Sequence, residues 1–135
     1  MRSQGFTIIE LMIVAVIIGI LTAIVIPNYI SMQDRAKEAK VKGNCHALHL
    51  AAEDYSVMND GHYSVAAADL LPRLPGAGLM ENAFTGAPTE PRFGAAAAAA
   101  GQIGIVAKQQ GGNTVGFTIT GFGKEAQILE LTNGH

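Results

Sequence analysis

The sequence predicts an α+β protein in which one long amino-terminal helix packs on a small three-stranded antiparallel sheet. Three patterns predict it: an apolar stretch from Phe6 to Ile26, an apolar stripe on the residues that follow to about Met58, and period-two alternation near the carboxyl end. With 135 residues and a net charge of −2, the chain suits one anchored domain and lacks the basic character expected if nucleic acid were its main ligand.

The apolar stretch is long enough to cross a membrane. As a helix, residues 6–26 rise roughly 31 Å, which matches the hydrocarbon core of a bilayer. Glu10 is the one ionisable side chain in it. Because a charge at mid-membrane costs about 3 kcal/mol on insertion scales, such a residue usually has a partner.

The stretch also differs from an ordinary secretory signal. The apolar run continues into Pro27 and a polar helix, with no A-x-A-like cleavage site at the junction, so it is expected to stay in the mature protein. The polar leader, residues 1–5, lies on the other side. Gly5, a flexible position before Phe6, offers a place where a protease can cut.

Residues 5–12, GFTIIELM, followed by an unbroken apolar helix and Pro27, resemble the class III signal of type IV pilins and type II secretion pseudopilins. The resemblance covers residues 1 to 30 and implies a pilin-like fold. It also implies that a prepilin peptidase cuts between Gly5 and Phe6, that Phe6 becomes N-methylated, and that Glu10 meets the terminal ammonium of a neighbouring subunit.

Physical chemistry favours the same role for Glu10. Once the leader is removed, a new ammonium and this carboxylate both lie in low dielectric, where neither is stable alone and a close pair attracts strongly. The two groups are poorly placed to meet within one helix, so a partner from another chain is expected. The alternative is that Glu10 reaches the headgroups near the helix end.

Small residues recur in the apolar span at four-residue steps, as Ala15, Gly19 and Ala23, and let neighbouring helices approach closely. Small residues are also common in membrane helices that lack such packing. Pro27 removes the hydrogen bond to the carbonyl of Ala23, so we expect a kink there.

From residue 28 to 58 the helix continues in amphipathic form. An apolar stripe at four- and three-residue steps is expected to support the head domain, and consists of Val41, Cys45, Leu48, Ala52 and Tyr55. The turn-forming sequence at residues 59–61, NDG, predicts the end of the helix. The predicted parts are therefore a leader (1–5), a membrane and assembly helix (6–27), its amphipathic continuation (28–58) and a head (59–135).

One helical cluster raises the question of a metal site. Cys45, His46, His49 and Glu53 have spacings seen in helical ligand sets, but no further cluster supports them. We expect a buried Cys45 thiol with solvated or subunit-facing histidines, and no metal or cofactor. As Cys45 is the one cysteine, no intrachain disulfide can form.

The rest of the head divides into irregular and strand-like parts. Residues 62–101 are rich in turn formers and include six alanines, 95–100, which predict a single helical turn or a mobile surface loop without function. Alternation predicts strands over 103–107 and 114–120, joined by a turn at 111–113, GGN, and a third strand over 126–132 with an ambiguous inward face.

These patterns favour a structural role. Motifs of hydrolases, nucleotide-binding loops and zinc proteases were not found, so we expect no enzyme activity. The resemblance implies a type IV pilus subunit that forms a helical homo-oligomer, with prepilin peptidase, assembly ATPases and platform proteins as partners. It places the chain in the inner membrane as a single-pass protein before assembly and in an extracellular pilus afterwards.

Two alternatives stay open. One is a minor pilin, or a type II secretion pseudopilin in a periplasmic pseudopilus; major pseudopilins carry an acidic calcium loop, whereas here Glu125 is the sole nearby acid. The other is a single-span binding protein with an accidental resemblance. Positive charge beyond the span, at Arg35, Lys37, Lys40 and Lys42, reverses a simple positive-inside count, so the expected outward head rests on the resemblance.

Overall fold

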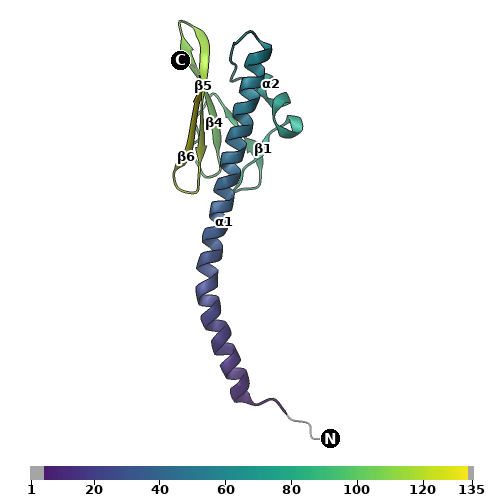
Figure 1. The fold of residues 1–135 in the computed structure, drawn as a ribbon, viewed down its shortest axis with the longest axis vertical. Coiled ribbons are helices and arrows are strands. Elements are labelled where there is room, and N and C mark those ends of the chain that lie inside the picture. Colours follow the sequence, from purple (N-terminus) through teal and green to yellow (C-terminus); the bar gives the residue numbers. More distant parts are fainter. Residues whose placement is uncertain (1–4, 134–135) are drawn as a thin grey trace. The chain divides into compact units, whose positions relative to one another are not determined.

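The computed structural model describes residues 5–133, so most of the predicted leader, residues 1–4, lies outside the described part of the chain. The chain divides into two compact units, residues 1–35 and 36–135, and each is described by itself. The helix α1, Ile8–Met58, contributes residues to both (Figure 1).

The first unit is the apolar part of α1. Its large apolar side chains are all exposed, and an 18-residue window within the helix has a mean hydropathy of 2.9, so by length and composition this helix can cross a membrane. The helix continues through Pro27, near which the Asn28 side chain donates a 3.2 Å hydrogen bond to the Ile24 carbonyl. The kink expected at Pro27 stays a prediction.

The second unit is built on an antiparallel meander. Strands β4 (Ile103–Gln110), β5 (Asn113–Phe122) and β6 (Gln127–Asn133) pair in order, with Ile105 opposite Ile119, and lie beside the second half of α1 (Figure 1). The predicted hairpin is confirmed. Gly111 and Gly112 form its turn with φ values of 62° and 87°, which glycine adopts at little steric cost.

The prediction of a three-stranded sheet is wrong in strand number. A short strand, β3 (Arg92–Phe93), pairs in parallel with β4 and makes a four-stranded sheet of order β3-β4-β5-β6. Strands β1 (Met80–Glu81) and β2 (Pro88–Glu90) form a second, two-stranded sheet. Strands of two or three residues are too short to show a period-two pattern, so the sequence did not reveal them.

Short helices precede the small sheet. They are α2 (Ala67–Leu70) and the 3₁₀ turns η1 (Leu71–Arg73) and η2 (Pro75–Ala77). Of the two alternatives for the alanine run, a helical turn or a surface loop, the helical turn is not formed. Ala95 instead bridges Ile105 of β4, and buried Ala97 donates its N–H to the Thr120 hydroxyl at 2.8 Å. The small side chains let this segment lie directly on the sheet.

The core lies between α1 and the sheet. The predicted stripe is confirmed, because Val41, Cys45, Leu48 and Ala52 are fully buried and Tyr55 is partly buried. They belong to one cluster with four buried side chains of the sheet, Ile103, Ile105, Phe117 and Ile119. The helix ends as predicted, with the Gly61 N–H bonded to the Ser56 carbonyl at 2.9 Å.

The packing of β6 resolves its ambiguous face. Gly121 pairs with Leu129 and Phe122 with Gln127, so Ile128 is an extra residue in a β-bulge. The bulge resets the alternation, so Ile128, Leu129 and Leu131 all pack against the core cluster.

Candidate assembly site

The amino-terminal end of α1 is organised by Thr7 and Glu10. Glu10 Oε2 accepts hydrogen bonds from the Thr7 backbone N–H at 2.9 Å and from the Thr7 hydroxyl at 2.7 Å. The Glu10 N–H in turn donates to Thr7 Oγ1 at 3.3 Å. Since the helix begins at Ile8, this is a reciprocal capping box, which occupies two of the N–H donors that a helix start leaves free, those of Thr7 and Glu10.

The capping box gives Glu10 a role inside its own chain that the sequence analysis missed. The signal was present, because Thr-x-x-Glu before an apolar run is the pattern of this motif. Only one carboxylate oxygen, Oε2, takes part in the two bonds. The other oxygen, Oε1, can accept a hydrogen bond from a further donor. The pairing of Glu10 with a neighbouring chain stays a prediction.

The predicted cleavage site lies just before the helix. Gly5 and Phe6 are both outside α1, and Phe6 is 74% exposed. A peptide bond in non-helical backbone has its N–H and C=O groups free of the helix ladder, so a protease can engage them without unwinding α1. The backbone geometry fits cleavage at this bond, and the cleavage itself stays a prediction.

The small residues of the membrane segment lie on one side of α1. Ala15, Gly19 and Ala23 are exposed, and a Cβ added at Gly19 would meet no atom within 4 Å outside the helix backbone. The position is therefore open to close approach by another helix. Packing of copies along this side stays a prediction.

The four residues considered for a metal site do not converge. Cys45 is fully buried, His46 is exposed, and His49 Nε2 lies 3.7 Å from Glu53 Oε1. Within residues 5–133, no group of three or more His, Cys, Asp or Glu side chains can hold a metal ion. His49 instead packs against Phe117 in an edge-to-face arrangement, with ring centroids 5.4 Å apart.

The Cys45 thiol is expected to make the head sensitive to alkali. Burial, with a smaller contribution from the Glu90 charge, raises the pKa of Cys45 from 9.0 to about 12. Because the unfolded thiol ionises first, stability is retained below pH 9 and falls by about 1.4 kcal/mol per pH unit between the two pKa values. Urea unfolding of the full chain in detergent should show this fall in the free energy of unfolding as the pH rises. In Cys45→Ala the part of the fall that comes from ionisation of the thiol should be absent.

A buried polar network holds the loops of the head. The Glu90 side chain, in a residue only 2% exposed, accepts hydrogen bonds from Asn82 Nδ2 at 3.0 Å, Thr89 Oγ1 at 3.1 Å and the Ile103 N–H at 2.9 Å. Asn82 Oδ1 also accepts hydrogen bonds from the backbone N–H groups of Phe84 and Thr85. Sequence reasoning missed this network, which joins both sheets to the intervening loop.

One ion pair, one hydrogen bond and one cation–π contact attach β1 and the loop after it to α1. Lys40 Nζ lies 2.7 Å from Glu81 Oε2, and Asn44 Nδ2 donates to the Glu81 carbonyl at 3.3 Å. Lys37 Nζ lies 5.4 Å from the centre of the Phe84 ring, within the range of a cation–π contact. Lys37 and Lys40, two of the basic residues that reverse the positive-inside count, therefore make contacts within the head.

Comparisons with known proteins agree with these features. Residues 1–26 match the family model described as the prokaryotic N-terminal methylation motif. The chain is 48% identical over 65 residues to the type IV major pilin protein PilA of Myxococcus xanthus, an alignment that covers 48% of this chain and 30% of that protein. It is 31% identical over 97 residues to the type II secretion system core protein G of Escherichia coli, with 67% of each chain covered. The chain belongs to the family of type IV pilins and type II secretion pseudopilins.

This pilin-family chain is also 39% identical over 106 residues to the type IV major fimbrial protein FimA of Dichelobacter nodosus, covering 78% of this chain and 62% of FimA. The chain spans 30% to 44% of the length of three relatives, PilA of Myxococcus xanthus among them, so each of these alignments covers less than half of the relative. No solved structure matches the chain significantly.

Proposed function

We propose that this chain is a structural subunit of a type IV pilus filament, processed after Gly5 and polymerised through the apolar half of α1. The observation that carries the proposal is the exposed apolar surface of residues 8–30, which lies next to the proposed cleavage site in a segment that matches the methylation motif. Such a surface is stable in a bilayer or when buried among copies of itself. Movement from the first environment to the second is filament assembly.

Glu10 is proposed to set the register of that assembly. Cleavage would expose an ammonium at Phe6, one residue before the capping threonine. Glu10 Oε2 is held by Thr7 of its own chain, which fixes the carboxylate at the helix start and leaves Oε1 to accept from the neighbour's ammonium. Since an unpaired charge is costly in the fibre core, copies that align these groups would be favoured over misaligned copies.

The proposed partners follow from the same family. They are a prepilin peptidase that cuts and methylates, and the ATPase and platform proteins that extract the subunit from the inner membrane. The chain would be a single-pass inner-membrane protein first and part of an extracellular pilus afterwards.

A pseudopilin of a type II secretion system is the second candidate function. The alignment with the E. coli core protein G favours it, because it covers two thirds of both chains. The filament would then stay in the periplasm and act in protein export. Both functions use the same cleavage, methylation and helix packing, so they differ in where the filament lies.

The test is to shear surface fibres from the source cells and determine the amino terminus of this chain by mass spectrometry in the sheared and membrane fractions. A chain that begins at N-methylated Phe6 and is abundant in the sheared fraction is the expected result. A processed chain confined to the cell envelope would favour the pseudopilin. An intact Met1 in both fractions would contradict both.

A further inference from the structure

The last residue of α1 is an exposed methionine, Met58. Its side chain is 68% exposed and does not belong to the core cluster of the head. The sulfur lies 3.6 Å from Arg73 Nη2, a distance at which a thioether accepts a hydrogen bond from the guanidinium. An exposed thioether is thus held beside a fixed positive charge.

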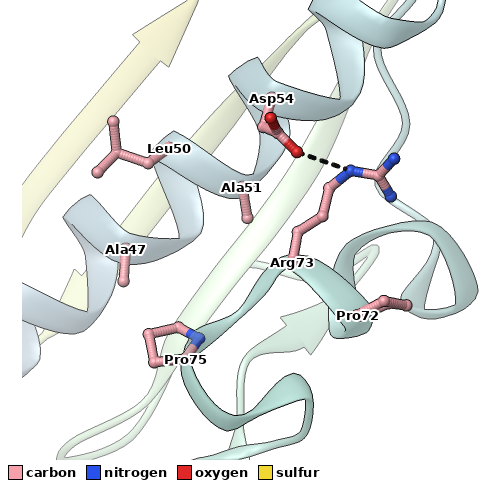
Figure 2. Close-up of a pocket in the computed structure, with 7 residues that line it drawn as sticks. All are labelled: Ala47, Leu50, Ala51, Asp54, Pro72, Arg73 and Pro75. Atoms are coloured by element: carbon pink, nitrogen blue, oxygen red, sulfur yellow. Dashed lines mark hydrogen bonds and ion pairs between the residues drawn. The ribbon is translucent and has the colours of Figure 1, made fainter.

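Arg73 connects the end of α1 to the segment that follows it. Figure 2 shows its side chain extending from η1 toward Asp54 of α1, and the dashed line marks the 3.0 Å contact of Arg73 Nε with Asp54 Oδ2. Arg73 Nη1 donates to the Asp69 carbonyl at 2.6 Å, and the guanidinium lies 5.1 Å from the centre of the Tyr55 ring. The guanidinium therefore contacts α1, α2 and its own 3₁₀ turn at once.

The three nitrogens of this guanidinium have acceptors of unequal strength. Nε and Nη1 bond to oxygen atoms, whereas Nη2 bonds to the sulfur of Met58. A thioether sulfur is a weak acceptor, and a charged donor forms its strong hydrogen bonds with oxygen. An oxygen atom added to the sulfur would therefore give Nη2 the acceptor that best suits it.

We propose that Met58 is a modification site, which hydrogen peroxide oxidises to methionine sulfoxide and at which Arg73 binds the sulfoxide oxygen. A lone pair of the sulfur attacks one oxygen of the peroxide, so an S–O bond forms while the O–O bond breaks. The sulfur loses two electrons to the peroxide. The leaving hydroxide takes the proton of the transferred oxygen and becomes water. Methionine sulfoxide reductases reverse this modification.

The surroundings of Met58 favour the oxidised form. Oxidation usually destabilises a protein because it places a polar oxygen in an apolar core. Met58 is exposed, so its sulfoxide is not forced into the core. The side chain is unbranched and flexible, and a rotation brings the added oxygen within hydrogen-bond distance of Arg73 Nη2. Oxidation is therefore expected to strengthen the attachment of α1 to η1.

Two further methionines serve as internal references. Met32 is 69% exposed but lies in the first unit, and Met80 is 7% exposed and belongs to the core cluster. Oxidation of Met80 would place a polar oxygen in the core and weaken the head. Met58 combines the exposure of Met32 with the guanidinium contact, and it lies within the head, so a pilin and a pseudopilin would both carry this site.

The first test is treatment of the purified full chain in detergent with hydrogen peroxide, followed by peptide mass spectrometry. Met58 is expected to gain one oxygen atom roughly tenfold faster than Met80, because a buried sulfur reacts only when the head opens locally. A Met58 that is oxidised no faster than Met80 would overturn the site.

The second test measures the midpoint of thermal unfolding of the head by near-ultraviolet circular dichroism, before and after oxidation. Met58→Leu retains the other methionines, so it reports their share of the change. Relative to that variant, oxidation should raise the midpoint of the wild-type chain by about 4 °C. A wild-type midpoint that falls as far as that of Met58→Leu, or further, would overturn the binding of the sulfoxide.

Two other variants test the part played by Arg73. Arg73→Lys keeps the positive charge but has one nitrogen in place of three, so the rise on oxidation should disappear. A rise of unchanged size in this variant would overturn the role of the guanidinium. Met58→Gln supplies an amide oxygen without an oxidant and keeps Arg73, so its midpoint should exceed that of Met58→Leu. Equal midpoints of these two variants would contradict the proposal even where Arg73→Lys does not fold.

Discussion

Replacing Glu10 with glutamine is expected to lower the amount of assembled fibre about 30-fold or more, because removing one partner of a buried charge pair costs roughly 2 kcal/mol or more. Glutamine serves at this position of a capping box as glutamate does, so the start of α1 should be preserved. The variant therefore removes the charge while keeping the cap. The measurement is the amount of this chain in sheared fibres relative to the membrane fraction.

Thr7→Ala is the matched control for Glu10→Gln. It removes the hydroxyl that bonds to Glu10 Oε2, at a cost of about 1 kcal/mol to the helix start, but keeps the carboxylate charge. Its fibre yield should fall far less than that of Glu10→Gln. Wild-type yield from Glu10→Gln, with a strong loss from Thr7→Ala, would show that Glu10 acts as a cap and would contradict the pairing of charges between chains.

Replacing Glu90 with alanine is expected to destabilise the head by roughly 2–6 kcal/mol, since it leaves two N–H groups without an acceptor at about 1–3 kcal/mol each. They are the Ile103 N–H and one N–H of Asn82 Nδ2, which keeps its other bond to the Ala100 carbonyl at 3.2 Å. The free energy of unfolding of the full chain in detergent, measured by pulse proteolysis in urea, should show the loss. A fall of that size is a large fraction of the free energy of unfolding of a small domain.

Glu81→Ala provides the comparison for Glu90→Ala. Glu81 is an exposed acid that pairs with Lys40 at 2.7 Å, and solvent-exposed ion pairs of that kind contribute little to stability. The two variants remove the same side chain, so their difference isolates burial. Equal and small losses from both would show that the Glu90 network contributes little to the fold.

The features that could be predicted from the sequence are those that depend on a pattern extending over several neighbouring residues. The apolar span, the stripe from Val41 to Tyr55 and the hairpin at Gly111 and Gly112 all depend on a repeated spacing or on a turn that only a few residues adopt, and the described structure contains each of them. The methylation motif could also be recognised from the sequence, because it consists of several residues in a fixed order.

The features that were missed depend on contacts between distant segments. Strands β1, β2 and β3 have two or three residues each and form because other segments pair with them. The sequence alone does not distinguish a buried glutamate such as Glu90 from a solvated one. The donors that hydrogen-bond to Glu90 come from residues 82, 89 and 103, and two of these lie far from it in the sequence. For the alanine run the sequence left a helical turn and a surface loop open, because intrinsic helix propensity does not report the sheet on which the segment packs.

Electron cryo-microscopy of the sheared fibre tests the central claim most directly. We predict a core of apolar helices from this chain in which the Glu10 carboxylate lies within hydrogen-bond distance of the amino-terminal nitrogen of Phe6 in a neighbouring copy. A fibre of this chain in which Glu10 contacts only Thr7 of its own helix, with the neighbour's terminus elsewhere, would contradict the role of Glu10 in setting the register.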